Sequence, residues 1–101
     1  MTLNNQTDDN IQRVSKFFKN ISDPTRLRIL LALSEDEMNV STITERLGME
    51  QSAISHQLKL LRENHLVKSR KEGKSVVYSL DDQHVIDILR ETFLHMDHIK
   101  D

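Results

Sequence analysis

The chain has 101 residues, of which 37% are apolar and 30% charged, and it contains two glycines, one proline and no cysteine. This length suffices for one domain with its own core, and the scarcity of glycine and proline predicts a mostly helical chain. The lack of cysteine excludes disulfides, thiolate catalysis and sulfur-ligated metals, so any metal must be bound by histidine and carboxylate. No apolar run is long enough to span a bilayer and no signal-peptide pattern opens the chain, so we expect a cytoplasmic protein with no membrane partner.

The net charge of −2 is unevenly distributed along the chain. Residues 51–80 contain six basic and two acidic residues, whereas residues 81–101 contain two basic and six acidic residues. A basic middle followed by an acidic, histidine-bearing end predicts two functions on one domain, one directed at phosphates and one at a cation.

The N-terminal third predicts two helices after a frayed start at residues 1–8. From Asp8 onward, apolar residues recur at helical spacing and indicate an amphipathic helix. A second helix begins after Asp23, which can cap it, with Pro24 at the first helical position. Its leucines predict a core helix that ends in the acidic turn at residues 34–37.

Residues 40–62 predict a helix-turn-helix. The first of its two short helices stops at Gly48, which is suited to the left-handed conformation just past a helix end. A second run of helical period, containing Ile54, begins three residues later. Two short helices joined by a tight glycine-containing turn are typical of this motif.

Residues 67–80 predict a β-hairpin, because the period of the apolar residues changes there from 3.6 to 2. Residues 67–71 form its first strand and residues 72–74 its turn. A hairpin directly after a helix-turn-helix is a wing, and residues 81–99 predict a final helix with one broad apolar side. The fold class is therefore mostly α with a β-hairpin wing: a single winged helix-turn-helix domain over residues 1–101, which we expect to dimerise through its N- and C-terminal helices.

The second helix of the predicted motif has a polar side that can face outward as a group. Measured by helical angle, this side lies about 100–200° from Ile54 on the apolar side. Small hydroxyls, an imidazole and an ammonium suit the major groove of DNA, because they let the backbone approach and can bond to phosphates or base edges; a glutamine can pair with adenine. The predicted DNA-binding residues of this helix are Gln51, Ser52, Ser55, His56 and Lys59.

An ordinary solvated face is the alternative for this helix taken alone. The wing that follows favours the DNA-binding interpretation, because its lysine and arginine side chains can contact phosphates and supply salt-sensitive affinity. Since only 4% of the residues are aromatic, the chain has no stacking platform for single strands, and double-stranded DNA is the predicted partner. The wing bases are Lys68, Arg70, Lys71 and Lys74.

The final helix carries Asp82 and His84 near its start and His95 and His98 near its end. Eleven positions return His84 and His95 to one face but separate them by roughly 16 Å along the axis, so they cannot hold one ion within one chain. Two such helices packed antiparallel about a two-fold axis would place the start of one beside the end of the other and form two sites. Each site would offer three imidazoles and one carboxylate, which suit zinc and are acceptable to cobalt.

Two alternatives remain open at this point. In the first, Asp81 or Asp82 is only a helix cap and the histidines are surface residues, which leaves a metal-independent repressor of the same fold. In the second, the chain buffers metal or is an enzyme with an open zinc position for water, although it lacks a nucleophile constellation and a HExxH-type helix. Of the two remaining histidines, His56 is interpreted as facing DNA, and His65 as supporting the ligands or packing.

Three segments resemble the ArsR/SmtB family of metal-sensing repressors: SDPTRLRIL at 22–30, QSAISHQLKLL at 51–61 and VVYSL at 76–80. The resemblance covers nearly the whole chain, and the pattern in the final helix is similar to that of CzrA-type zinc and cobalt efflux repressors. It implies Asp82 and His84 from one protomer with His95 and His98 from the other as ligands, and a metal-bound dimer that holds DNA poorly.

The same resemblance bears on the choice of metal. Family members with an arsenic, cadmium or lead site have cysteines near the positions that correspond to 39–41, so that site is not expected in this cysteine-free chain. The ligand types leave zinc, cobalt and nickel open as the effector, because the same donors can serve several ions.

Overall fold

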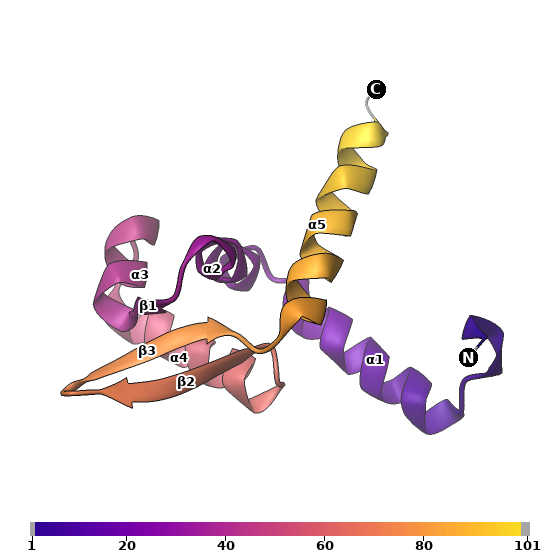
Figure 1. The fold of residues 1–101 in the computed structure, drawn as a ribbon, viewed down its shortest axis with the longest axis horizontal. Coiled ribbons are helices and arrows are strands. Elements are labelled where there is room, and N and C mark those ends of the chain that lie inside the picture. Colours follow the sequence, from indigo (N-terminus) through magenta and orange to yellow (C-terminus); the bar gives the residue numbers. More distant parts are fainter. Residues whose placement is uncertain (1, 100–101) are drawn as a thin grey trace.

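A small antiparallel sheet lies beside the helices, and its hairpin projects at one side of the molecule, in the computed structural model, which describes residues 2–99 (Figure 1). Met1, Lys100 and Asp101, which belong to the predicted domain, lie outside the described residues. The elements in chain order are η1 (Leu3–Asn5), α1 (Asp8–Ile21), α2 (Pro24–Glu35), β1 (Met38–Asn39), α3 (Val40–Leu47), α4 (Gln51–Glu63), β2 (Val67–Glu72), β3 (Ser75–Leu80) and α5 (Gln83–His98). This arrangement confirms the predicted mostly helical winged helix-turn-helix, in which α3 and α4 form the motif.

Local signals in the sequence set the helix ends. Asp23 and Asn39 cap α2 and α3, each accepting a hydrogen bond from the backbone N–H three residues further on, at 3.0 and 2.9 Å. Pro24 stands at the start of α2, where its missing N–H has no helical partner. Gly48 ends α3 with φ 64°, the left-handed conformation predicted for it.

The sheet has the strand order β1-β3-β2, and both pairings are antiparallel. The hairpin register runs from Val67 opposite Leu80 to Glu72 opposite Ser75. Glu72 therefore belongs to the first strand, and the prediction of a three-residue turn is wrong. Gly73 adopts φ 64°, so that it and Lys74 suffice for a two-residue turn that matches the twist of the strands.

The strand β1 was not predicted from the sequence. Met38 pairs with Tyr78 and Asn39 with Val77, so β1 adds a third strand to the wing directly before α3. The residue that caps α3 is therefore also part of the sheet, opposite Val77.

One apolar core joins the helix-turn-helix to the wing and to the start of α5. Because the recognition motif, the sheet and α5 share this core, they form one packed body. No helix within residues 2–99 has the length and apolar character to cross a membrane. The core residues are Ile29, Leu30, Leu33, Met38, Ile43, Ile54, Leu58, Leu61, Leu66, Val67, Leu80, Val85 and Leu89.

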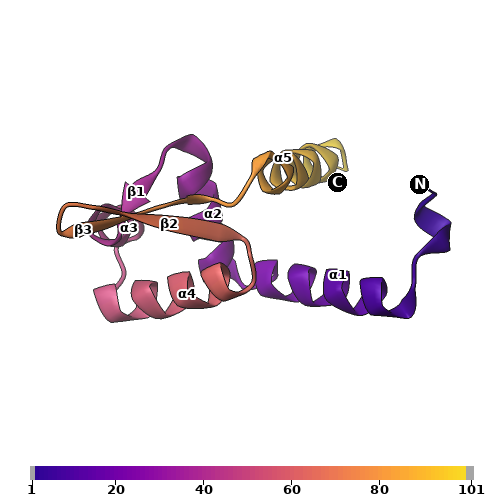
Figure 2. The ribbon, with the colours of Figure 1, turned by 60° about the horizontal axis from the view of Figure 1, so that its bottom comes forward.

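The helices α1 and α5 lie at the end of the molecule opposite to the wing tip and α3, in both views (Figures 1 and 2). Their apolar rows are largely uncovered: Phe18 of α1 is 52% exposed and Met96 of α5 is 59% exposed. Exposed apolar patches of this kind indicate a surface that another chain covers. The other exposed large apolar residues of the two helices and the residue after α5 are Ile11, Val14, Phe93, Leu94 and Ile99.

Candidate nucleic-acid interface and metal site

The helix α4, called the recognition helix below, separates its apolar and polar sides cleanly. Ile54, Leu58 and Leu61 are fully buried against the core. The predicted DNA-binding residues of this helix are all exposed: Gln51, Ser52, Ser55, His56 and Lys59. The recognition helix therefore presents the polar set to solvent as a group, and contact with DNA stays a prediction.

The wing and the start of the recognition helix meet at one shallow depression of about 220 Å³. Gln51 and Lys74, which are far apart in the sequence, both line it. Ser41 at the start of α3 lines it too and is exposed. Sequence reasoning missed Ser41, although its place in the first turn of α3, two residues after the cap Asn39, could have identified it.

Arg70 behaves differently from the other wing bases. Its guanidinium forms two hydrogen bonds to the carboxylate of Glu37, at 2.5 and 2.7 Å, and a third to Glu72 at 2.8 Å. These bonds raise the pKa of Arg70 and lower the pKa of Glu37 from its ordinary value. Lys68, Lys71 and Lys74 form no ion pair with any residue between 2 and 99, so Arg70 is the wing base already neutralised by acids of its own chain.

Asp82 stands at the start of α5, where the sequence placed it. Its Oδ1 accepts the backbone N–H groups of His84 at 2.9 Å and Val85 at 3.3 Å. Partial burial raises the pKa of Asp82, but the N–H of Val85, the side chain of His84 and the N–H of His84 together lower it below its ordinary value. The Nδ1 of His84 lies 3.5 Å from the same Oδ1, so this carboxylate and imidazole are already neighbours in one chain.

His95 and His98 stand in the last turn of α5, at the opposite end of the same helix. Every residue from Arg90 to Ile99 is exposed, so this half of α5 extends beyond the core, as Figure 1 shows. In the described part of the chain, no three histidine or carboxylate side chains come together as a metal site. The four predicted ligands thus form two separate pairs within one chain.

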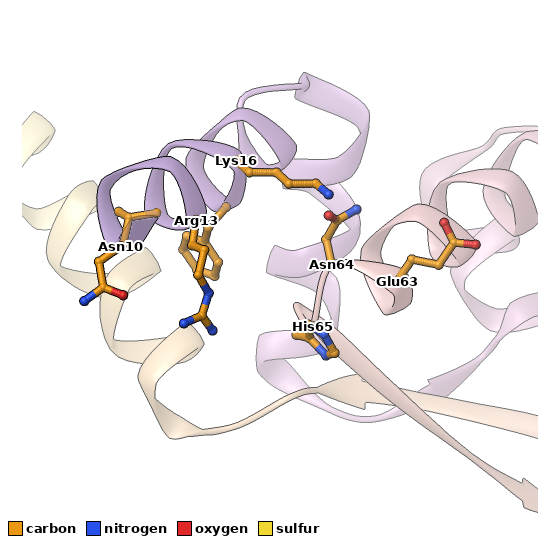
Figure 3. A pocket seen from close by; sticks show the side chains of 8 residues that line it. Asn10, Arg13, Lys16, Glu63, Asn64 and His65 are labelled. Atoms are coloured by element: carbon orange, nitrogen blue, oxygen red, sulfur yellow. The ribbon is translucent and has the colours of Figure 1, made fainter. Parts of the chain in front are cut away.

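A groove of about 560 Å³ separates α1 from the C-terminal end of the recognition helix (Figure 3). Arg13 and Lys16 reach into it from α1, and Asn64 and His65 line its other side. His65 adopts φ 60°, an uncommon backbone conformation for a residue other than glycine, and its side chain is exposed. His65 is therefore not a core-packing residue of the single chain.

Comparison with known proteins identifies the family. The model described as "Bacterial regulatory protein, arsR family" matches residues 23–69. The transcriptional repressor SmtB homolog of Synechocystis is 41% identical over 88 residues, which cover 87% of this chain and 67% of that protein. The transcriptional regulator NmtR of Mycobacterium tuberculosis is 41% identical over 87 residues, which cover 86% and 72%.

Solved structures agree with these relatives. The solution structure of apo-NmtR matches with a TM-score of 0.80 and 38% identity, covering 93% of this chain and 79% of that one. A homodimeric winged helix-turn-helix DNA-binding domain from Mycobacterium bovis, described as a possible ArsR-family regulator, matches with a TM-score of 0.85 and 26% identity, covering 92% and 89%. These proteins are regulators rather than enzymes, and they do not distinguish a CzrA-type chain from other branches. The fold, the matched segment and the level of identity together show that this chain belongs to the arsR family of bacterial regulatory proteins.

Proposed function

We propose that this chain is a transcriptional repressor that binds double-stranded operator DNA as a homodimer and is released from it by zinc, or a similar ion, held between the C-terminal helices. In this proposal Asp82 and His84 of one chain and His95 and His98 of the other form the site, as in a CzrA-type repressor. Among the relatives, one is named a repressor, another a cadmium-resistance regulatory protein, and a solved neighbour a homodimer.

The observation that carries the proposal is the outer half of α5. From Arg90 onward every residue of this half is exposed, yet it holds both histidines and three large apolar side chains, and the exposed Ile99 follows it. A helix with such a surface gains stability when a second copy covers it. A two-fold pairing of these helices would bring the ligand pair at the end of one helix toward the pair at the start of the other.

The chemistry of the four side chains fits zinc. Imidazole nitrogen and carboxylate oxygen are the donors that zinc accepts, and a tetrahedral site needs four of them. The Oδ1 atom of Asp82 accepts the hydrogen bonds of the helix cap. No hydrogen bond or ion pair within residues 2–99 involves its Oδ2, which leaves that oxygen available to a metal. When bound, zinc would supply a bond between two chains, whereas Asp82 and His84 alone fix only the start of one helix.

Mixed dimers test whether the site lies between chains. A dimer of one His84→Ala chain with one His95→Ala chain keeps one intact site. In that site, Asp82 and His84 come from the His95→Ala chain, and His95 and His98 come from the His84→Ala chain. Equilibrium dialysis should find no stoichiometric zinc on either variant alone. An equal mixture, unfolded and refolded together, should bind about one quarter of the wild-type amount, since half of the dimers are mixed and each has one of two sites.

The result separates the proposal from its rivals. Zinc that binds fully to each single variant would place the ligands elsewhere. Wild-type protein that binds no zinc, cobalt or nickel would favour a metal-independent repressor, in which Asp82 acts only as the cap observed here.

Arg70 and Lys74 should contribute differently to DNA binding. Lys74→Gln should lower the slope of log K against log salt concentration by about 1, because one phosphate contact is lost. Arg70→Gln should leave this slope almost unchanged, because Glu37 and Glu72 already neutralise that guanidinium. Fluorescence anisotropy at a series of salt concentrations measures both slopes, and equal losses for the two variants would contradict the expectation.

A further inference from the structure

The side chain of Arg26 links three helices. Its Nε donates a hydrogen bond of 2.7 Å to the backbone carbonyl of Asn20 in the last turn of α1. Its Nη1 donates a bond of 3.0 Å to Oε1 of Gln57 on the recognition helix. All three residues are half-buried, and Arg26 lies in the first turn of α2, where its backbone N–H donates to the cap Asp23.

These bonds matter because α1 and the recognition helix are not packed together along their whole length. The groove described above separates α1 from the C-terminal end of the recognition helix (Figure 3). The helix α2 contacts both of them, and Arg26 supplies hydrogen bonds in two directions from it. A guanidinium holds its N–H donors in one rigid plane, so two bonds to different helices restrict the angle between them.

We propose that Arg26 is a positioning residue that sets the orientation of the recognition helix relative to α1. This inference rests on the proposed DNA binding by the recognition helix and on dimerisation through α1. If α1 lies at the two-fold axis, its angle to each recognition helix determines how the two recognition helices fit successive half-sites of DNA. Arg26 then determines which half-site spacing the dimer binds best, although it contacts neither DNA nor metal.

The test measures spacing discrimination without any metal. The probe is a duplex that the wild-type protein selects from a random-sequence pool, together with the same duplex lengthened by one base pair between its half-sites. Arg26→Gln and Gln57→Leu should each reduce the ratio of the two affinities by about fivefold. The double variant should reduce it no further than Arg26→Gln alone, because Arg26→Gln already removes the bond between Arg26 and Gln57.

Two matched variants separate positioning from general effects. Arg28→Gln removes the same charge from an exposed position of α2 that forms no hydrogen bond or ion pair with residues 2–99, and should keep the wild-type ratio. Gln57→Glu keeps an acceptor for Arg26 and should also keep the ratio, even if its charge lowers both affinities. If Arg26→Gln fails to fold, Gln57→Leu decides alone, since it leaves the bond to Asn20 in place.

An unchanged ratio in Gln57→Leu, or effects that multiply in the double variant, would overturn the role of Arg26 and leave the proposed function intact. A wild-type protein that selects no duplex at all would overturn DNA binding itself, and this inference with it.

Discussion

His95→Ala should leave DNA affinity without metal within about twofold of the wild-type value and should abolish the release of DNA by zinc. The side chain of His95 is exposed on the half of α5 that extends beyond the core, so its removal has little effect on folding or on the recognition helix. By linkage, the zinc-dependent loss of affinity that disappears is typically about 5- to 150-fold. Fluorescence anisotropy with and without zinc measures both quantities.

A matched control for this variant is Glu91→Ala, which removes another exposed side chain from the same half of α5 and should still be released by zinc. His98→Ala should behave like His95→Ala, because residues three apart lie side by side on a helix. Release of the His95→Ala protein at the wild-type zinc concentration would show that the assigned site is wrong.

Phe18→Glu should convert the protein from a dimer to a monomer and weaken binding to a two-half-site operator by about a hundredfold or more. Phe18 is 52% exposed in the apolar row of α1, and a carboxylate there would have to be desolvated in a dimer interface. Once the chains separate, each half-site binds alone and the gain from linking them is lost. Light scattering gives the mass, and anisotropy gives the affinity.

Gln12→Glu serves as the control, because it adds the same charge to α1 about 120° around the helix from Phe18. It should remain a dimer with nearly wild-type affinity. Circular dichroism establishes whether the separated Phe18→Glu chain stays folded, since subunits of obligate dimers often unfold alone. A folded, dimeric Phe18→Glu protein would remove α1 from the interface.

The helices were predictable because their signals are local. Asp23 and Gly48 are residue types that start and end helices by their own side chain or backbone freedom, and both do so here. The strand β1 escaped prediction because two residues carry no periodicity. Met38 and Asn39 are a strand only by pairing with Tyr78 and Val77, about forty positions later in the chain.

The candidate sites were predictable to different degrees. Exposure of the polar side of the recognition helix followed from the period of its apolar residues. The neutralisation of Arg70 did not, because Glu37 is 33 positions away and only the fold brings the two together. The metal site depends on how two chains pack, which neither the sequence nor the fold of one chain specifies.

The two-residue strand β1 has a practical consequence for engineering. Asn39 belongs to β1, where it pairs with Val77 of β3, and it also caps α3. The hairpin and the first helix of the motif are therefore connected through this residue. In a chimera that takes only the hairpin from a relative, Met38 and Asn39 would have to pair with a foreign β3 strand in place of Tyr78 and Val77. Grafts that carry residues 38 and 39 along with 67–80 should be more stable than grafts of the hairpin alone. The strand β1 and the hairpin together are then the smallest unit of this wing that can be transferred.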